Sequence, residues 1–117
     1  MRRIVLLALA VACLAGCRSP RIAVTVENRT GAAVELLEVD YPSASFGVDR
    51  LAAEASYNYR IQIRGSGPVR VQYMDPATHR QFQIAGPTLQ ERQAGGLQIV
   101  LLPGGKADFR PSIAPAR

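Results

Sequence analysis

The sequence predicts an all-β protein, a small antiparallel β-sandwich of about six to seven strands. From Arg21 onward apolar and polar residues alternate with a period of two, the pattern of strands that bury one face. No window of eleven residues has the pattern of an amphipathic helix. Turn-forming residues such as Gly, Pro, Asn and Asp separate the alternating segments at short intervals, as they do in all-β domains.

The N-terminal segment differs from the rest of the chain and does not belong to this fold. Arg2 and Arg3 give it a positive start, residues 4–14 form an unbroken apolar run, and Ala15 and Gly16 are small. Such a run is too short to cross a bilayer core of about 30 Å as a mature helix. The three parts together have the organisation of a secretory signal peptide, so we expect residues 1–16 to be removed.

The segment Leu14-Ala15-Gly16-Cys17 resembles the lipobox of bacterial lipoproteins. The resemblance implies cleavage between Gly16 and Cys17, a diacylglycerol thioether on Cys17, and an acylated N-terminus. Each buried methylene contributes about 0.8 kcal/mol, so two or three acyl chains would hold the protein on a membrane essentially permanently. An ordinary secretory signal without lipid is the alternative interpretation.

The lipobox resemblance implies a location in the bacterial cell envelope. In Gram-negative lipoproteins, an Asp directly after the lipidated Cys resembles the signal for retention in the inner membrane. This chain has Arg18 at that position. This favours the periplasmic face of the outer membrane if the host is Gram-negative. Residues 17–20 form only a short linker, and three extended residues reach about 10 Å. The domain should therefore lie close to the headgroups, where Arg18 and Arg21 could contact anionic lipid.

Cysteine usage agrees with this interpretation. Cys13 lies in the removed segment and Cys17 would carry the lipid, so the mature chain would have no disulfide and no free thiol. An exported domain of this kind must be stabilised by an apolar core. We expect that domain at residues 21–110, followed by a disordered Pro- and Ala-rich tail at 111–117.

The first strand patterns lie at residues 22–26 and 34–41. Val34 and Leu36 share one phase of the alternation, whereas Leu37 and Val39 share the other. This slip by one residue predicts a β-bulge near Leu36–Leu37, or burial on both faces. The segment 42–48 is expected to be a loop with a short strand carrying Phe46.

Two hairpins follow from the parity of opposed residues. Pairing Ile61 with Val71 leaves Gly65-Ser66-Gly67 as a three-residue loop. Pairing Tyr73 with Phe82 leaves residues 76–79 as a loop closed by Asp75 and Arg80.

Further along, residues 88–93 are compatible with one helical turn. Residues 97–102 are apolar on both faces, which predicts a central strand.

The number and spacing of these strands resemble the immunoglobulin-like and fibronectin-like accessory domains of exported bacterial proteins. The resemblance is architectural and covers roughly residues 21–110. The Cys and Trp hallmarks of true immunoglobulin domains are absent, since the chain has no Trp.

Catalytic and metal-binding chemistry finds little support in the sequence. His79 is the only histidine and falls in the 76–79 loop, so a zinc site would need carboxylates for its other ligands. Asp40, Asp49 and Glu54 surround one loop but do not form a calcium-loop motif. The Gly-rich pieces at 65–70 and 103–106 lack the spacing of a phosphate-binding loop. We therefore predict no catalytic residue, no metal, no cofactor and no small-molecule substrate.

The charge balance excludes one class of partner and leaves another open. Without Arg2 and Arg3 the formal net charge of +5 falls to +3, too small to indicate nucleic-acid binding. The register of the first hairpin would place Arg60, Arg64 and Arg70 on one polar face. Three arginines on one face could bind an acidic partner, although a solvated face is the simpler interpretation.

Taken together, the sequence predicts a membrane-anchored, non-enzymatic binding or accessory module that acts on another envelope protein. One alternative is a structural subunit of an envelope machine, since small β-sandwich lipoproteins resemble the pilotins of secretion systems. A second alternative is a hydrolase that uses His79 or a carboxylate as its base.

Overall fold

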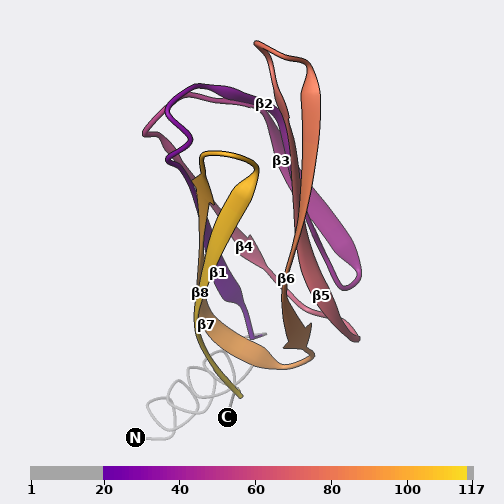
Figure 1. The fold of residues 1–117 in the computed structure, drawn as a ribbon. Helices are drawn as coiled ribbons and strands as arrows, with labels where there is room; N and C mark the ends of the chain where they lie inside the picture. The colour runs from indigo at the N-terminus through magenta and orange to yellow at the C-terminus, as the bar shows by residue number, and fades with distance from the viewer. Residues whose placement is uncertain (1–19, 116–117) are drawn as a thin grey trace, which may run out of the picture.

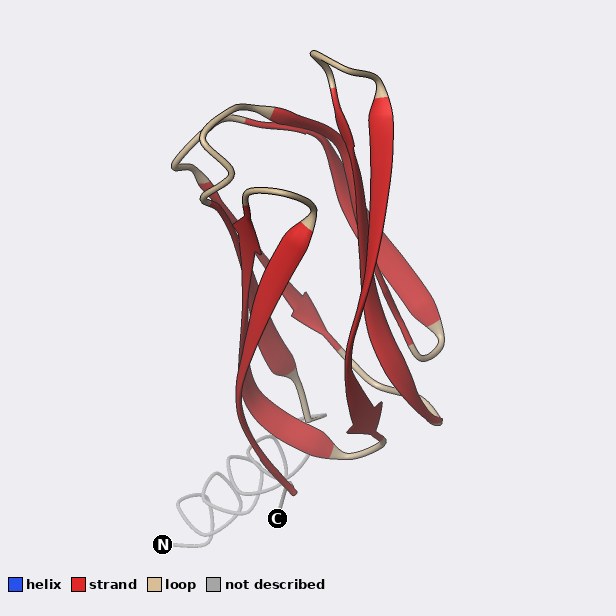
Figure 2. Cartoon of the chain, viewed as in Figure 1, coloured by secondary structure: helices blue, strands red, loops and turns tan. Residues whose placement is uncertain are grey.

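Two four-stranded sheets pack face to face in the computed structural model, which describes residues 20–115 (Figures 1 and 2). Within these residues there is no helix, and hence none long and apolar enough to span a membrane. The predicted small β-sandwich is therefore confirmed, with eight strands rather than six to seven. The strands are β1 (Ile22–Asn28), β2 (Val34–Tyr41), β3 (Ala44–Leu51), β4 (Ser56–Ile61), β5 (Ser66–Asp75), β6 (Arg80–Gln90), β7 (Gln93–Leu102) and β8 (Lys106–Pro115).

The first sheet has the order β4-β1-β7-β8, and the second has the order β3-β2-β5-β6. Every pair is antiparallel except β1 and β7, which run parallel with Val24 beside Leu97. The prediction of a central strand at residues 97–102 is confirmed, because β7 lies between β1 and β8. Val100, on the outward phase of β7, is also buried, as the double-sided apolar pattern predicts.

Alternating residues of both sheets meet in one apolar core. On β1 the even-numbered apolar residues point inward, and on β5 the odd-numbered ones do, so each strand contributes every second residue. The most deeply buried large side chains are Ile22, Leu37, Ile61, Leu89, Leu97, Ile99 and Leu101.

Aromatic side chains close one lateral side of the sandwich, where the edge strands β3 and β4 meet. The ring of Phe46 on β3 stacks on Tyr59 of β4, with their centroids 4.7 Å apart. Tyr57, two residues earlier on β4, lies at a centroid distance of 6.1 Å from Phe46. This stacking explains why Tyr59, although 45% exposed, stays on the core-facing phase of its strand.

A buried amide organises the end of the sandwich where β1 stops. Asn28 is fully buried, and its Nδ2 donates to the carbonyls of Ala32 at 2.8 Å, Leu51 at 3.1 Å and Ala52 at 3.2 Å. Its Oδ1 accepts from the backbone N–H of Thr30 at 3.0 Å and from the Thr30 hydroxyl. One side chain thus satisfies backbone hydrogen-bonding groups of the β1–β2 loop and links this loop to the end of β3, in the other sheet.

Two of the local predictions are confirmed. Tyr73 pairs with Phe82, and Asp75 pairs with Arg80 around the 76–79 turn. The register between β2 and β5 shifts between Glu35 and Glu38, which is the predicted bulge.

The other predicted hairpin is wrong. Ile61 pairs with Ile22 rather than Val71, and β4 and β5 belong to different sheets. Residues 62–65 cross between the sheets instead of forming a tight turn. Alternation had identified correctly that Ile61 and Val71 are both buried, but it does not decide which strand lies opposite.

The predicted disordered tail and helical turn are also wrong. Residues 111–115 continue β8 and pair with β7 as far as Pro115 opposite Gln93. Pro111 fits there because β8 is an edge strand, where a residue without an N–H can face solvent. Residues 88–93 end β6, turn at Glu91–Arg92 and begin β7.

Candidate binding face

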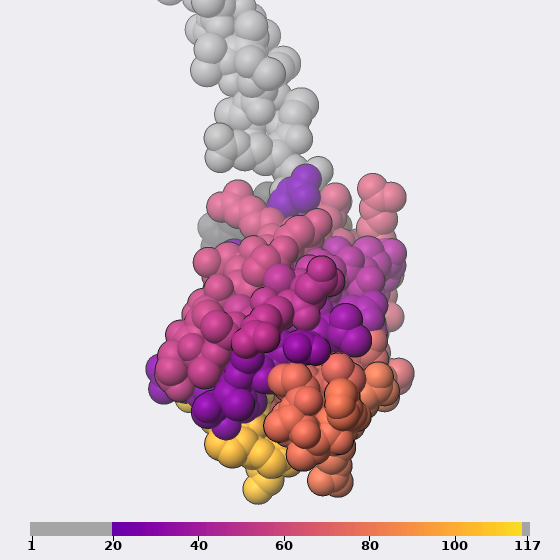
Figure 3. All heavy atoms as spheres, turned by 90° about the horizontal axis from the view of Figure 1, so that it is seen from above, coloured from indigo at the N-terminus to yellow at the C-terminus, as the bar shows by residue number. Residues whose placement is uncertain are grey.

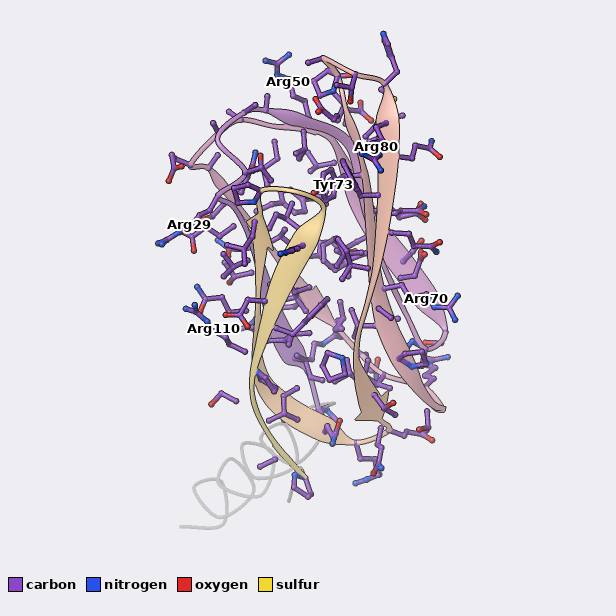
Figure 4. The ribbon with its side chains drawn as sticks, in the orientation of Figure 1. Arg29, Arg50, Arg70, Tyr73, Arg80 and Arg110 are labelled. Atoms are coloured by element: carbon purple, nitrogen blue, oxygen red, sulfur yellow. The ribbon has the colours of Figure 1, made fainter. Side chains whose placement is uncertain are left out.

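The predicted arginine face does not exist as a single surface. Arg60 lies on β4 in the first sheet, Arg70 lies on β5 in the second sheet, and Arg64 lies in the connection between them. The predicted face depended on the incorrect hairpin between β4 and β5. Arg70 projects from the outer side of the second sheet, away from the first sheet (Figure 4).

The outer side of the second sheet carries an open groove of about 640 Å³. Its floor is built from neighbouring residues of β5 and β6, since Gln72 pairs with Gln83 and Met74 pairs with Gln81. The backbone of Tyr73 and Phe82 contributes between them, while their rings pack toward the core. We call the set of groove residues with outward side chains the binding face: Leu36, Glu38, Gln72, Met74, Gln81 and Gln83.

Leu36 is the distinctive residue of this face. It occupies the β2 bulge with a φ of 51°, in the left-handed region that non-glycine residues rarely adopt. This conformation turns its side chain outward, so that Leu36 is 57% exposed while neighbouring Leu37 is buried. The bulge thus places an apolar side chain in solvent at a conformational cost of about 1–2 kcal/mol.

Polar side chains surround Leu36 and are held by cross-strand contacts. The Nε2 of Gln72 donates a hydrogen bond to the carboxylate of Glu38 across β2 and β5. Asp40 lies two residues further along β2, opposite Arg70. Partial burial, followed by the nearby Glu38, raises the pKa of Asp40 above its usual range, and Arg70 opposes that rise. The face therefore sets the apolar side chains of Leu36, at its β2 side, and Met74 among amide and carboxylate groups.

A second, smaller cavity of about 220 Å³ lies at the end of the sandwich where β5 turns into β6. It is lined by the β1–β2 and β7–β8 loops together with Tyr73, Asp75 and Phe82. Figure 3 views the molecule from this end, with the β5–β6 turn in orange beside the β7–β8 turn in yellow. Burial raises the pKa of Tyr73, and the nearby Asp75 adds to this rise.

His79 lies in the turn next to this cavity but does not line it. It is exposed and adopts a left-handed backbone with a φ of 56°. Asp75 accepts hydrogen bonds from the N–H of Ala77 at 3.0 Å and from the Thr78 hydroxyl at 3.1 Å, so its carboxylate shapes the turn. Arg80 lies over the ring of Phe82 at 5.4 Å.

The other sequence-selected residues have structural positions or fall outside the described range. Asp40 lies on β2, Asp49 on β3 and Glu54 in the loop after β3, and no cluster of three metal-ligating side chains occurs within residues 20–115. The lipobox residues Leu14, Ala15, Gly16 and Cys17 lie outside the residues that the structure describes.

Sequence reasoning did not identify the binding face. The slip of phase between Leu36 and Leu37 was one available signal, and it predicted the bulge without showing which leucine would be exposed. The long polar run of Gln81 and Gln83 on β6 was a second signal, because alternating glutamines mark an outward face.

Comparison with known proteins provides information about the fold and not about the function. No family model matches the chain, and no curated protein matches it. The chain is similar to a solved structure described as the NMR structure of the protein from Eubacterium rectale, with a TM-score of 0.59 and 10% sequence identity. The match covers 79% of this chain and 88% of that one. At this level of identity the two chains share an architecture.

Proposed function

We propose that the protein is a lipid-anchored, non-enzymatic binding module of the bacterial cell envelope that holds a protein partner on its binding face. The observation that carries this proposal is Leu36, an exposed leucine in a left-handed bulge conformation beside a groove. Strained backbone conformations persist where the surrounding structure enforces them, and they concentrate at functional sites.

The chemistry of the face suits a protein surface. Exposed apolar side chains beside hydrogen-bonding groups are the arrangement of a small protein–protein contact, in which the apolar part loses water and the polar groups form hydrogen bonds. Glu38, Gln81 and Gln83 offer amide and carboxylate groups to the partner. The expected partner therefore presents an apolar pocket bordered by hydrogen-bond donors.

The anchor follows from the lipobox resemblance at residues 14–17, with Cys17 as the lipidated residue. It would hold the domain at the membrane surface, on the periplasmic side of the outer membrane in a Gram-negative host. A partner in the same envelope compartment would then meet the face at a raised local concentration.

The alternative of a structural subunit in an envelope or secretion assembly uses the same anchor and the same face. It differs in that the partner would be a fixed component of a complex encoded nearby, which gene neighbourhood would reveal. The alternative of a hydrolase has less support, because His79 is exposed on a turn and lines neither of the cavities described above.

Two experiments test the two halves of this proposal. Metabolic labelling with palmitate should label the wild-type chain and leave Cys17→Ser unlabelled and released from membranes; an unlabelled wild type contradicts the anchor.

For the face, the tagged wild-type chain and Leu36→Asn are compared in crosslinked envelope fractions. A partner captured equally by both contradicts the assignment of the face.

A further inference from the structure

The loops at one end of the sandwich lie where the chain enters its first strand. Ile22, the first residue of β1, pairs with Ile61 at the end of β4 and with Gly95 near the start of β7. The connection 62–65 and the Glu91–Arg92 turn therefore lie at the same end as Arg21, as Figure 1 shows for the lower end of the molecule. We call this the proximal end.

Three exposed arginines gather at the proximal end. They are Arg21 before β1, Arg64 in the connection between β4 and β5, and Arg92 in the turn between β6 and β7. Glu91 is the only carboxylate in these loops.

The ion pairs of the described residues involve other arginines. Arg29 pairs with Glu27, Arg110 pairs with Asp108, and Arg50 lies 4.0 Å from Glu35. Within residues 20–115, Arg21, Arg64 and Arg92 form no ion pair, so their positive charge is not neutralised locally.

The position of Arg92 adds a second observation. Its φ is 67°, in the left-handed region where glycine or asparagine is more easily accommodated. The turn therefore carries a long cationic side chain at a position that backbone geometry alone would not favour.

We propose that the proximal end docks on anionic lipid headgroups through Arg21, Arg64 and Arg92, so that the strands stand upright on the membrane. This inference rests on the proposed lipid anchor, because Cys17 lies only three residues before Pro20 and three extended residues span about 10 Å. That tether keeps the proximal end within reach of the headgroups. The binding face, on the side of the second sheet, then stays accessible above the surface.

Electrostatics sets the size of the expected effect. Each arginine close to an anionic surface contributes about fivefold to binding, so three together shift the balance between docked and undocked domains roughly a hundredfold. Because the attraction falls off within a Debye length, high salt should remove most of it.

The test uses the processed, lipidated chain in vesicles of phosphatidylcholine with or without phosphatidylglycerol. Ser43, in the turn between β2 and β3, also lies at the proximal end, because its neighbour Pro42 lies beside Gly67 at the start of β5. A fluorophore is placed on Ser43→Cys or, at the opposite end, on Thr78→Cys, and a headgroup quencher reports its distance from the surface. We expect quenching at position 43 to be much stronger in phosphatidylglycerol vesicles at low salt than in pure phosphatidylcholine vesicles, and we expect little quenching at position 78.

Charge reversal supplies the matched control. The triple variant R21E/R64E/R92E should lose the quenching at position 43, whereas R50E/R80E/K106E, with the same change in net charge at the opposite end, should keep it. Circular dichroism checks that both variants fold. Equal quenching with and without phosphatidylglycerol, or equal behaviour of the two triple variants, overturns the proposal.

The outcomes separate docking from anchoring. Retention on pure phosphatidylcholine vesicles reports the acyl anchor alone, whereas the dependence on phosphatidylglycerol reports the arginines. If R21E/R64E/R92E keeps its quenching but loses a crosslinked partner, the arginines bind an acidic protein, and membrane docking is wrong.

Discussion

Glu38 and Gln72 are joined by a side-chain hydrogen bond that crosses from β2 to β5 at the edge of the groove. The bond ties the strand that carries the Leu36 bulge to the strand that forms the groove floor. Polar side chains fixed in this way lose little entropy when a partner contacts them. These two residues of the binding face are therefore held in place before any partner arrives.

The first prediction separates stability from binding at Leu36. Leu36→Asn should leave the free energy of unfolding unchanged or raise it by up to about 1 kcal/mol, because Asn tolerates the left-handed backbone better than Leu does. The same variant should lose partner capture. Urea denaturation of the purified domain measures the first effect, and crosslinking in envelope fractions measures the second.

Leu37 provides the matched control, since it is buried only one position away. Leu37→Ala should destabilise the domain by about 2–5 kcal/mol through loss of core contacts. A stability loss in Leu36→Asn as large as that in Leu37→Ala would show that Leu36 is a structural residue.

The second prediction concerns the attachment of β8. Gly95 has a φ of 132°, and a Cβ added there would clash with the carbonyl oxygen of Ser112 on β8. Gly95→Ala should therefore destabilise the domain by at least about 2 kcal/mol. It should also speed the amide hydrogen exchange of β8.

The adjacent glycine is the control for that variant. A Cβ at Gly96 would meet the carbonyl of Ala23 at 3.7 Å, an ordinary contact. Gly96→Ala should change stability by less than about 1 kcal/mol. Equal effects of the two substitutions would mean that β8 is not held against β7 as described.

The third prediction concerns the buried amide of Asn28. Asn28→Ala should cost about 2–4 kcal/mol, because it leaves buried carbonyls and a backbone N–H without partners. Asn28→Asp should be worse, since a carboxylate would face the carbonyl oxygens of Ala32, Leu51 and Ala52. Asn58→Ala, on the exposed outer side of β4, is the control and should stay within about 0.5 kcal/mol of wild type. Thermal denaturation of the three variants measures these stability differences, and an Asn28→Ala domain as stable as Asn58→Ala would contradict the prediction.

The fourth prediction is a pH dependence from Asp40. Its folded pKa is raised, chiefly by burial and then by Glu38, so the folded state favours the protonated carboxyl. The ionised form therefore destabilises the fold at neutral pH, and this penalty is relieved as the pH falls through the folded pKa toward the unfolded value. Asp40→Asn should be more stable than wild type at pH 7, and the difference should shrink in acid. Thermal melts across this range that show a constant difference would contradict the account.

Sequence reasoning succeeded for Tyr73 and Phe82, where Asp75 and Pro76 favour a type I turn that sets the register of the two strands. It failed for Ile61 and Val71 because period-two alternation reports which side of a sheet is buried and is silent about the neighbouring strand. Two sheets that share one core give the same inward pattern as one hairpin.

The other failures have equally local causes. The Pro- and Ala-rich composition of residues 111–115 suggested disorder. Pairing with β7 nevertheless orders this segment as an edge strand, where a proline can direct its missing N–H toward solvent. Whether Leu36 or Leu37 is exposed depends on the positive φ of Leu36, which cannot be predicted from the amino-acid sequence. The site therefore became visible only when the bulge and the strands beneath it were in place.

The central claim is that a partner protein contacts the binding face, and photo-crosslinking in living cells tests it most directly. A photoreactive residue is introduced at Gln81, which is exposed in the groove, or at Asn58, which is exposed on the opposite sheet. We predict one strong crosslinked product from position 81 that Leu36→Asn abolishes, and no such product from position 58. The same product from both positions, or from position 81 regardless of Leu36, would contradict the account.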